Sequence, residues 1–270
     1  MNNAIGYVEL HLCDEVDPGE ISRIMACPYT VFLRSFVQIT DIPLSEYIRR
    51  RKLTCAAYEI QNTGAKIIDI ALKYGYESSD AFCVAFKRLH GITPMKARKS
   101  AARLKFYSQL HFTLTIKGVS EMDYRLMEKE AFKVIGRRRT TPHGGGTWEI
   151  VKNDGSFEDM KKLSGHMCDL GLCFGFDEDG NNDYMCGIEY DKEDLPEFES
   201  YTFPNSMWLV FEAKGPISEG VLGNVWKRIY NEFLPQSEYK QIDLPTVEKY
   251  IRWDNDTDEC KVEIWIPVKK

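Results

Sequence analysis

An internal repeat in the first hundred residues limits the folds open to this chain more than any other feature. The segment 20–42 aligns with the segment 69–92, so that Phe32 falls on Phe82 and the apolar positions that follow also coincide. Each copy has two apolar-periodic runs around a short break, the pattern of two helices joined by a tight turn. The repeat therefore predicts two helix–turn–helix units in an all-α region.

The second helix of each copy is expected to show one face to the core and one to a partner. In the later copy this helix begins after Ser78, a good N-cap, and its apolar stripe contains Phe82 and Phe86. The residues expected to face outward are Thr30, Leu33 and Arg34 in the first copy and Ser79, Asp80, Val84 and Lys87 in the second.

The segment 44–64 between the copies reads as one long helix ended by Gly64 in the C′ position. Two hairpins joined by a rigid helix could place two recognition helices in successive major grooves of DNA, about 34 Å apart. From the pattern alone, a helical bundle with no role in nucleic-acid binding remains an alternative.

Charge divides the chain into two parts. It has 35 Lys+Arg against 41 Asp+Glu, a net charge of -6. Residues 1–105 hold 15 basic and 11 acidic side chains, so the first part is mildly basic and the remainder is strongly acidic. This asymmetry predicts two domains with different partners, of which only the basic one suits DNA.

Composition also bears on the compartment. No run approaches the roughly 18 apolar residues of a membrane helix, and the first residues lack a basic stretch followed by an apolar block. The 8 cysteines contain no C-x-x-C pair and lie mostly in apolar patterns. We therefore expect reduced thiols in a cytoplasmic protein without a membrane partner.

The acidic part is predicted to be an α+β domain with a mostly antiparallel sheet. The segments that carry this prediction are strand material over 123–141 with a bend near Glu130, a hairpin over 168–190, a strand over 206–215, an amphipathic helix over 218–237, and strands over 245–253 and 260–270.

Three motifs are set aside. The run HGGG at 143–146 is similar to an esterase oxyanion loop, but no G-x-S-x-G nucleophile motif accompanies it, so a flexible loop is predicted. The run DEDGNND at 177–183 lacks the spacing of a calcium loop and is predicted to be a hairpin turn. The histidines show no ligand spacing, and we expect neither a metal nor a cofactor.

A carboxylate among aromatic rings is the candidate ligand site. In the last strand, Glu263 and Trp265 share the face opposite Val262, Ile264 and Ile266. Aromatic rings attract an apolar cation, and a carboxylate offsets its charge. The candidate ligand-binding residues are Trp208, Trp226, Tyr230, Glu248, Tyr250, Trp253, Glu263 and Trp265. The alternative is that these aromatics form a core and that Glu263 is solvated.

Residues 4–99 resemble the DNA-binding domain of AraC/XylS-type transcription regulators. The matching elements include PLSEYIRRRKL, IIDIALKYGYESSDAF and AFKRLHGITPMKAR. The resemblance implies a single polypeptide that reads a bipartite, non-palindromic DNA site with two helix–turn–helix units. Members of the family typically have an arginine in each recognition helix. Arg34 supplies it in the first unit, and Val84 stands at the corresponding position in the second. Because valine cannot pair with guanine or neutralise phosphate, we expect modest affinity.

Residues 122–270 resemble a GyrI-like effector-binding domain, through AFKVIGRR, FPNSMWLVFEAKGPISE, WKRIYNEFLPQSEYK, LPTVEKY and VEIWIPVKK. The resemblance implies two β–α–β–β units related by a pseudo-two-fold axis, with a groove for aromatic or cationic compounds. The family's acidic residues fall on Glu248 and Glu263, and Trp208 stands where the family usually has tyrosine. The expected division is a DNA-binding domain over 1–103, a linker over 104–121 and a GyrI-like domain over 122–270.

Together the two resemblances predict a ligand-responsive transcription regulator and not an enzyme. A ligand would change the orientation of the two domains about the junction 104–123, and a contact with RNA polymerase is left open. Two alternatives remain. One is a hydrolase of electrophilic small molecules with Glu263 or Glu248 as the general base. The other is a protein that sequesters a drug or a partner.

Overall fold

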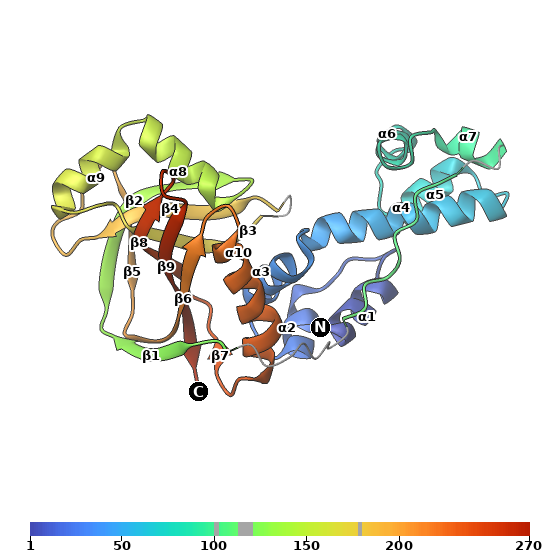
Figure 1. Cartoon of the computed structure of the whole chain (residues 1–270). Coiled ribbons are helices and arrows are strands. Elements are labelled where there is room, and N and C mark those ends of the chain that lie inside the picture. Colours follow the sequence, from blue (N-terminus) through green and yellow to red (C-terminus); the bar gives the residue numbers. More distant parts are fainter. Residues whose placement is uncertain (100–102, 113–120, 178–179) are drawn as a thin grey trace. The chain divides into compact units, whose positions relative to one another are not determined.

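The computed structural model describes residues 1–99, 103–112, 121–177 and 180–270 (Figure 1). The chain forms two compact units, one of Met1–Ala26 and Leu44–Ile116 and the other of Cys27–Pro43 and Lys117–Lys270. The first unit is helical, and the second combines one N-terminal helix with the sheet domain. The domain boundaries predicted from the sequence stay predictions.

The helical unit has one core between its later helices. Its helices are α1 (Asn2–Leu10), α2 (Pro18–Met25), α4 (Leu44–Asn62), α5 (Ile67–Lys73), α6 (Ser79–His90) and α7 (Pro94–Lys99). Leu53 and Ile60 of α4 pack with Ile70 of α5 and with Phe82 and Phe86 of α6, all fully or almost fully buried. The helical prediction for this region is confirmed, and the apolar residues of the second copy of the repeat, 69–92, contribute to this core.

The ends of these helices test the predicted caps. The Ser78 side chain accepts a hydrogen bond from the Ala81 amide at 3.2 Å, so the predicted N-cap of α6 is confirmed. Gly64 stands at the predicted C′ position, because α4 ends at Asn62, but it lacks the positive φ of a left-handed helix cap. Thr63 instead follows the helix with its amide bonded to the Glu59 carbonyl at 2.9 Å.

An extended segment, residues 103–112, is bound to the helical unit. The Tyr107 amide donates to the Thr54 hydroxyl at 3.3 Å, and the Tyr107 carbonyl accepts from Arg51. The Leu110 amide donates to the Tyr47 hydroxyl at 3.3 Å. These contacts lie in the first part of the predicted junction 104–123, and residues 113–120 of that junction lie outside the described residues.

The second unit is built on a curled antiparallel sheet. Its helices are α3 (Tyr29–Thr40), α8 (Gly144–Asn153), α9 (Ser156–Ser164) and α10 (Val221–Arg228), which continues as a π-helical turn (Ile229–Phe233) and a 3₁₀ turn (Leu234–Gln236). Its strands are β1 (Tyr124–Lys129), β2 (Phe132–Thr141), β3 (Leu170–Phe176), β4 (Asn182–Glu189), β5 (Glu199–Phe203), β6 (Ser206–Pro216), β7 (Lys240–Gln241), β8 (Thr246–Asp254) and β9 (Glu259–Lys269).

The sheet has internal symmetry. Its strand order is β1-β6-β9-β8-β3-β4-β2-β5, with β7 beside β9, and the paired strands are antiparallel. Read outward from the central β3–β8 pair, each side has the second, third and first strand of a β–α–β–β unit. The first β–α–β–β unit contains α8 and α9, and the second β–α–β–β unit contains α10. The α+β prediction and the implied pair of units are confirmed.

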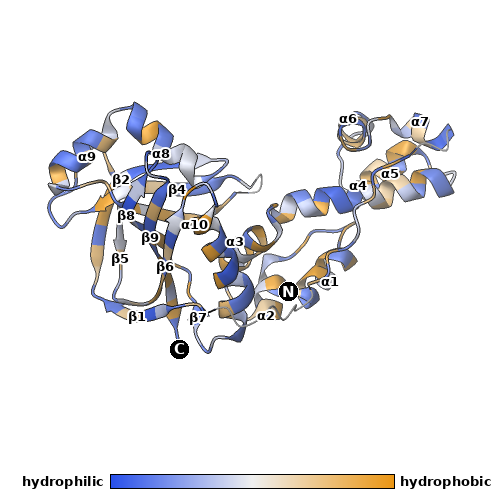
Figure 2. Ribbon diagram, viewed as in Figure 1, coloured by the Kyte–Doolittle hydropathy of each residue, from blue (hydrophilic) through white to orange (hydrophobic). Residues whose placement is uncertain are grey.

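Both faces of the sheet are buried. On one face, Trp226 and Ile229 of the α10 segment pack on Ile264 and Val262 of β9, and Val151 of α8 packs within a neighbouring cluster. Figure 1 shows α8 and α10 over this face, and Figure 2 shows polar and apolar residues alternating along the strands. We refer to it as the helix face.

The opposite face curls onto itself. The ring centroids of Phe132 on β2 and Trp265 on β9 lie 6.4 Å apart, although three strands separate β2 from β9 in the sheet order. The curl brings aromatic and aliphatic side chains of many strands into one cluster, which we call the inner face. Aromatic residues on this face are therefore part of a packed core.

Two local predictions for this unit need correction. The predicted flexible loop at 143–146 is wrong: His143 caps α8, and its Nδ1 accepts from the Gly146 amide at 3.1 Å. The glycines allow close packing, since a Cβ at Gly144 would lie 3.0 Å from the Tyr184 ring. The predicted turn at 177–183 includes residues 178–179, which lie outside the described residues. None of the described helices is long and apolar enough to cross a membrane.

Candidate functional site

The outer face of α6 is open to a partner. Asp80, Val84 and Lys87 are exposed, with Val84 70% exposed, whereas Ser79 is half-buried at the start of the helix. Phe82 and Phe86 on the opposite side are fully buried, which fixes the rotation of the helix. The geometry thus leaves the predicted reading residues of α6 free for DNA, and their contact with DNA stays a prediction.

The corresponding face of α3 is not open. Thr30 is exposed and Leu33 is half-buried, but the Arg34 side chain is only 3% exposed, so its expected outward position is wrong. Arg34 Nη1 donates to the Leu244 carbonyl at 2.9 Å, and Nη2 donates to the Phe174 carbonyl at 2.5 Å. The sheet domain therefore holds the arginine that the sequence predicts to contact DNA.

A caged carboxylate lies on the helix face at the centre of the sheet. Glu248 of β8 accepts three hydrogen bonds: Trp226 Nε1 donates to Oε1 at 2.7 Å, and the Tyr184 and Tyr250 hydroxyls donate to Oε2 at 2.6 and 2.8 Å. Trp148 closes one side, with its ring 5.1 Å from that of Tyr250. We call these five residues the Glu248 cage.

The cage hydroxyls remain protonated. Burial raises the pKa of the Tyr184 hydroxyl well above its ordinary value, and the neighbouring Glu248 charge raises it further. The same two causes, in the same order, raise the pKa of Tyr250. Both phenols are therefore hydrogen-bond donors to Glu248 at physiological pH. Both Glu248 carboxylate oxygens therefore accept hydrogen bonds from neutral donors.

Comparisons with known proteins match each half of the chain to a protein family. Residues 122–269 match the family described as the GyrI-like small molecule binding domain, and residues 21–100 match a helix-turn-helix domain. The transcriptional activator AarP of Providencia stuartii is 48% identical over 94 residues, which cover 35% of this chain and 70% of AarP. The chain belongs to the AraC family and carries a GyrI-like domain.

Another relative and one solved structure are also similar to parts of the chain. The regulatory protein SoxS of Salmonella typhimurium is 42% identical over 94 residues, which cover 35% of this chain and 88% of SoxS. Among solved structures, that of SAV2435 bound to tetraphenylphosphonium matches 55% of this chain and 94% of its own, with 23% identity and a TM-score of 0.47. The relatives AarP and SoxS are regulatory proteins, and this AraC-family chain is a DNA-binding transcription regulator.

The GyrI-like domain separates the predicted ligand residues of this regulator onto two faces. Trp226, Glu248 and Tyr250 meet in the cage, and Tyr230 stacks on Trp226 with ring centroids 6.0 Å apart. Trp253 lies beside the cage, since its ring centroid is 5.7 Å from that of Tyr250. These five residues form one neighbourhood on the helix face.

The remaining predicted residues lie apart from the cage. Trp208 and Trp265 are buried in the inner-face cluster, with ring centroids 6.0 Å apart. Glu263 is held by Arg125 at 3.0 Å and accepts from Trp265 Nε1 at 3.0 Å. Glu263 and Trp265, which share one face of β9, are thus neighbours as predicted, but they do not face the Glu248 cage.

Tyr184 and Trp148 are the cage residues that sequence reasoning missed. Tyr184 is on β4 and Trp148 is on α8, so both come from the first β–α–β–β unit, whereas the residues predicted from the sequence come from the second. Strand alternation alone relates residues of one strand and cannot relate β4 to β8. The symmetry of the two β–α–β–β units places β3 beside β8 and β4 beside β3. It is the signal that could have brought Tyr184 close to Glu248.

The cysteines and potential metal ligands give no second site. All eight cysteines are free, and burial raises the pKa of the Cys168 thiol to about 12 and that of Cys173 to about 11. These thiols are therefore protonated and poor nucleophiles. Within the described ranges, no three His, Cys, Asp or Glu side chains come together in a way that could hold a metal ion.

Proposed function

We propose that this regulator senses an apolar, aromatic cation at the Glu248 cage and changes its DNA binding in response. The single observation that carries the proposal is a half-buried carboxylate enclosed by two indoles and two phenols. An aromatic cation could replace the hydroxyl donors and stack on the rings. The charge of Glu248 would then be offset by the ligand.

Charge selectivity follows from this arrangement. A neutral ligand in the cage would gain apolar contact but would leave Glu248 without the donors that it displaced, which costs free energy in a partly buried site. A cation supplies the lost electrostatic compensation. Glu263 cannot serve the same purpose, because Arg125 already pairs with it at 3.0 Å.

On the DNA side, we propose a bipartite site read by α3 and α6. The reading residues would be Thr30, Leu33 and Arg34 of α3 and Ser79, Asp80, Val84 and Lys87 of α6. A regulator of this kind would act in the cytoplasm, and a contact with RNA polymerase stays a prediction.

Calorimetric titration of the full chain with tetraphenylphosphonium, an aromatic monocation without hydrogen-bond donors, tests the ligand site. Glu248→Gln should weaken binding on the order of tenfold or more, because it removes the charge that attracts the cation. Glu263→Gln is the matched control and should leave the affinity unchanged. Neutral triphenylphosphine oxide should bind more weakly to the wild type and should lose little in Glu248→Gln.

Equal tetraphenylphosphonium affinities for wild type and Glu248→Gln would rule out the cage as the cation site. The DNA side is tested by selection from random duplexes with the full chain, followed by a salt titration. The proposal expects two short boxes about one helical turn apart and an affinity that falls steeply with salt. Selection of no sequence would reject DNA reading by this chain.

A further inference from the structure

The groove that holds α3 offers oxygen acceptors to the side chains that would otherwise contact DNA. A cavity of about 410 Å³ lies between α3 and the sheet domain, and Asp177 and Asp243 are among its lining residues. Asp183 also lines it and is paired with Arg138. Thr30 Oγ1 donates to Asp243 Oδ1 at 2.5 Å, and Arg34 donates to two carbonyl oxygens. The reading face of α3 therefore meets carboxylate and carbonyl oxygens where DNA would offer phosphate and base oxygens.

Contact with this groove and contact with DNA exclude one another. The Arg34 guanidinium is almost fully buried, and its two terminal nitrogens are bonded within the protein. A base edge or a phosphate can reach these nitrogens only after α3 leaves the groove. We infer that the groove of the GyrI-like domain is an autoinhibitory docking site for α3, which competes with DNA for its reading face. This inference rests on the proposed DNA reading by α3.

A second contact secures the other end of α3. Lys227 of α10 forms an ion pair with Asp41, the residue that ends α3, at 3.0 Å. Ile39 of α3 packs against the apolar cluster that contains α10. The helix is thus held at its start by the 243–244 turn and at its end by α10.

The Glu248 cage lies on the elements that hold α3. Trp226, which donates to Glu248, directly precedes Lys227, which pairs with Asp41. The Arg34 acceptors Phe174 and Leu244 lie on β3 and just before β8, the paired central strands that carry Gly171 and Glu248. A cation that displaces Trp226 and the cage hydroxyls would shift α10 and these strands, and would loosen both holds on α3.

The test is a double variant of the full chain, Asp243→Asn with Lys227→Gln. It weakens one contact at each end of α3, because a neutral amide replaces the Asp243 carboxylate and another replaces the Lys227 ammonium. The net charge is unchanged, so a gain in DNA affinity cannot come from bulk electrostatics. The matched control is Asp159→Asn with Lys162→Gln, an exposed ion pair of 3.1 Å on α9, whose neighbours include α8 and β4. We measure the affinity for the duplex selected by the wild type, together with hydrogen exchange of residues 29–40.

The inference expects the double variant to bind this duplex about fivefold more tightly than the wild type, and to exchange the α3 amides faster when no DNA is present. The control variant should match the wild type in both respects. Equal affinities and equal exchange for all three chains would overturn the inference while leaving the proposed function intact. If none of the chains selects a duplex, the proposed function fails and the inference fails with it.

Tetraphenylphosphonium tests the coupling to the cage. Saturating amounts should speed exchange of the α3 amides in the wild type and tighten its DNA binding toward that of the double variant. Glu248→Gln should show neither response at the same concentration. Cation binding that leaves α3 exchange and DNA affinity unchanged would overturn the link between the cage and α3.

Discussion

Gly171 of β3 lies opposite Glu248 of β8 in the central strand pair, and the space that its missing side chain leaves is taken by the Tyr184 hydroxyl. A Cβ built on Gly171 would lie 1.7 Å from that oxygen, which is far inside van der Waals contact. The hydroxyl uses the space to donate to Glu248 at 2.6 Å. The cage therefore depends on a glycine at this position for reasons of volume.

Gly171→Ala should disrupt the cage while the sheet still forms. The added methyl group must displace the Tyr184 ring, and overpacking of this kind costs about 1–3 kcal/mol of unfolding free energy. Tetraphenylphosphonium affinity should fall roughly tenfold, because the displaced Tyr184 ring no longer lies beside Glu248 where the cation would stack on it. Calorimetry and thermal unfolding of the full chain measure both effects.

The matched control is Gly6→Ala in α1, where a Cβ would meet no atom within 4 Å. A helical alanine there should be neutral or stabilising by up to about 1 kcal/mol. A Gly171→Ala chain with wild-type cation affinity would show that the position of the Tyr184 ring has no effect on cation binding.

Strand alternation predicted much of the fold but not the ligand neighbourhood. It placed Val262, Ile264 and Ile266 of β9 on one face, and these residues do pack beneath α10. It also paired Glu263 with Trp265 on the other face, where the curl of the sheet buries the indole. Alternation states which residues of one strand share a face, but the contacts across strands depend on pairing and curl, which a single sequence does not reveal.

Arg34 and the glycine run at 143–146 were misjudged for a different reason. Local pattern places Arg34 opposite the buried Phe32 and Phe36, which is correct for an isolated helical unit. Its burial comes from carbonyl oxygens 140 and 210 residues away. Three glycines disfavour a helix by intrinsic propensity, but here their lack of side chains allows α8 to pack closely. In both cases tertiary contacts override a local preference.

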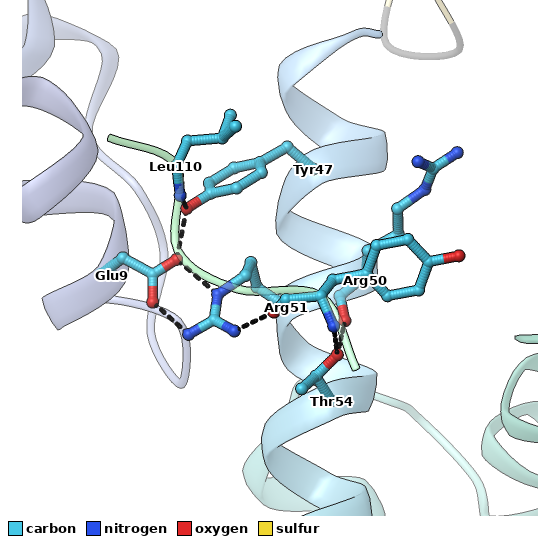
Figure 3. A network of polar contacts seen from close by, with 7 residues as sticks. Glu9, Tyr47, Arg50, Arg51, Thr54 and Leu110 are labelled. Carbon is cyan, nitrogen blue, oxygen red and sulfur yellow. Dashed lines mark hydrogen bonds and ion pairs between the residues drawn. The ribbon is translucent and has the colours of Figure 1, made fainter. Parts of the chain in front are cut away.

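Glu9→Gln should destabilise the helical unit strongly. Arg51 is buried and donates to both Glu9 oxygens at 2.8 Å, and Tyr47 donates to Glu9 Oε1 at 2.6 Å (Figure 3). Removing the carboxylate charge leaves Arg51 without its ion-pair partner in a mostly desolvated position, which costs about 3 kcal/mol. Chemical denaturation followed by helical circular dichroism measures the loss.

Glu46→Gln is the control for this network. Glu46 pairs with Arg49 and Arg50 on the partly exposed side of α4, where such pairs contribute about 1 kcal/mol or less. The two substitutions make the same chemical change on the same unit. Equal losses of unfolding free energy in the two variants would mean that the burial of Arg51 does not make its ion pair with Glu9 more stabilising than the exposed pairs of Glu46.

His90 should make the helical unit sensitive to mild acid. Burial lowers the pKa of His90 below its ordinary value of 6.5, which favours the neutral ring in the folded state. The contact of Nε2 with the Leu53 carbonyl at 3.2 Å raises the pKa, but by less than burial lowers it. Between the lowered pKa and 6.5 the unfolded chain binds more protons than the folded chain. Stability is therefore lost as the pH falls below about 6.5, by up to about 1.4 kcal/mol per pH unit.

Thermal unfolding of the wild type and of His90→Gln between pH 7.5 and 5.5 measures this loss. The variant should be less stable at pH 7.5, because it disturbs the packing of the ring on Phe86. It should lose less stability than the wild type as the pH falls, since it has no ring to protonate. Parallel pH profiles would exclude His90 as the acid-sensitive group.

Val84→Arg should strengthen the second reading helix. Val84 is 70% exposed on the outer face of α6, so an arginine there can reach DNA without disturbing the buried Phe82 and Phe86. One new phosphate contact should tighten binding to the selected duplex about three- to tenfold and steepen the slope of log K against log[salt] by about 0.9. Leu10→Arg adds the same charge at an 81% exposed site on α1, which has no predicted DNA contact, and should change the slope little. If both variants steepen the slope equally, the gain is a general effect of charge, and α6 does not lie against the DNA at Val84.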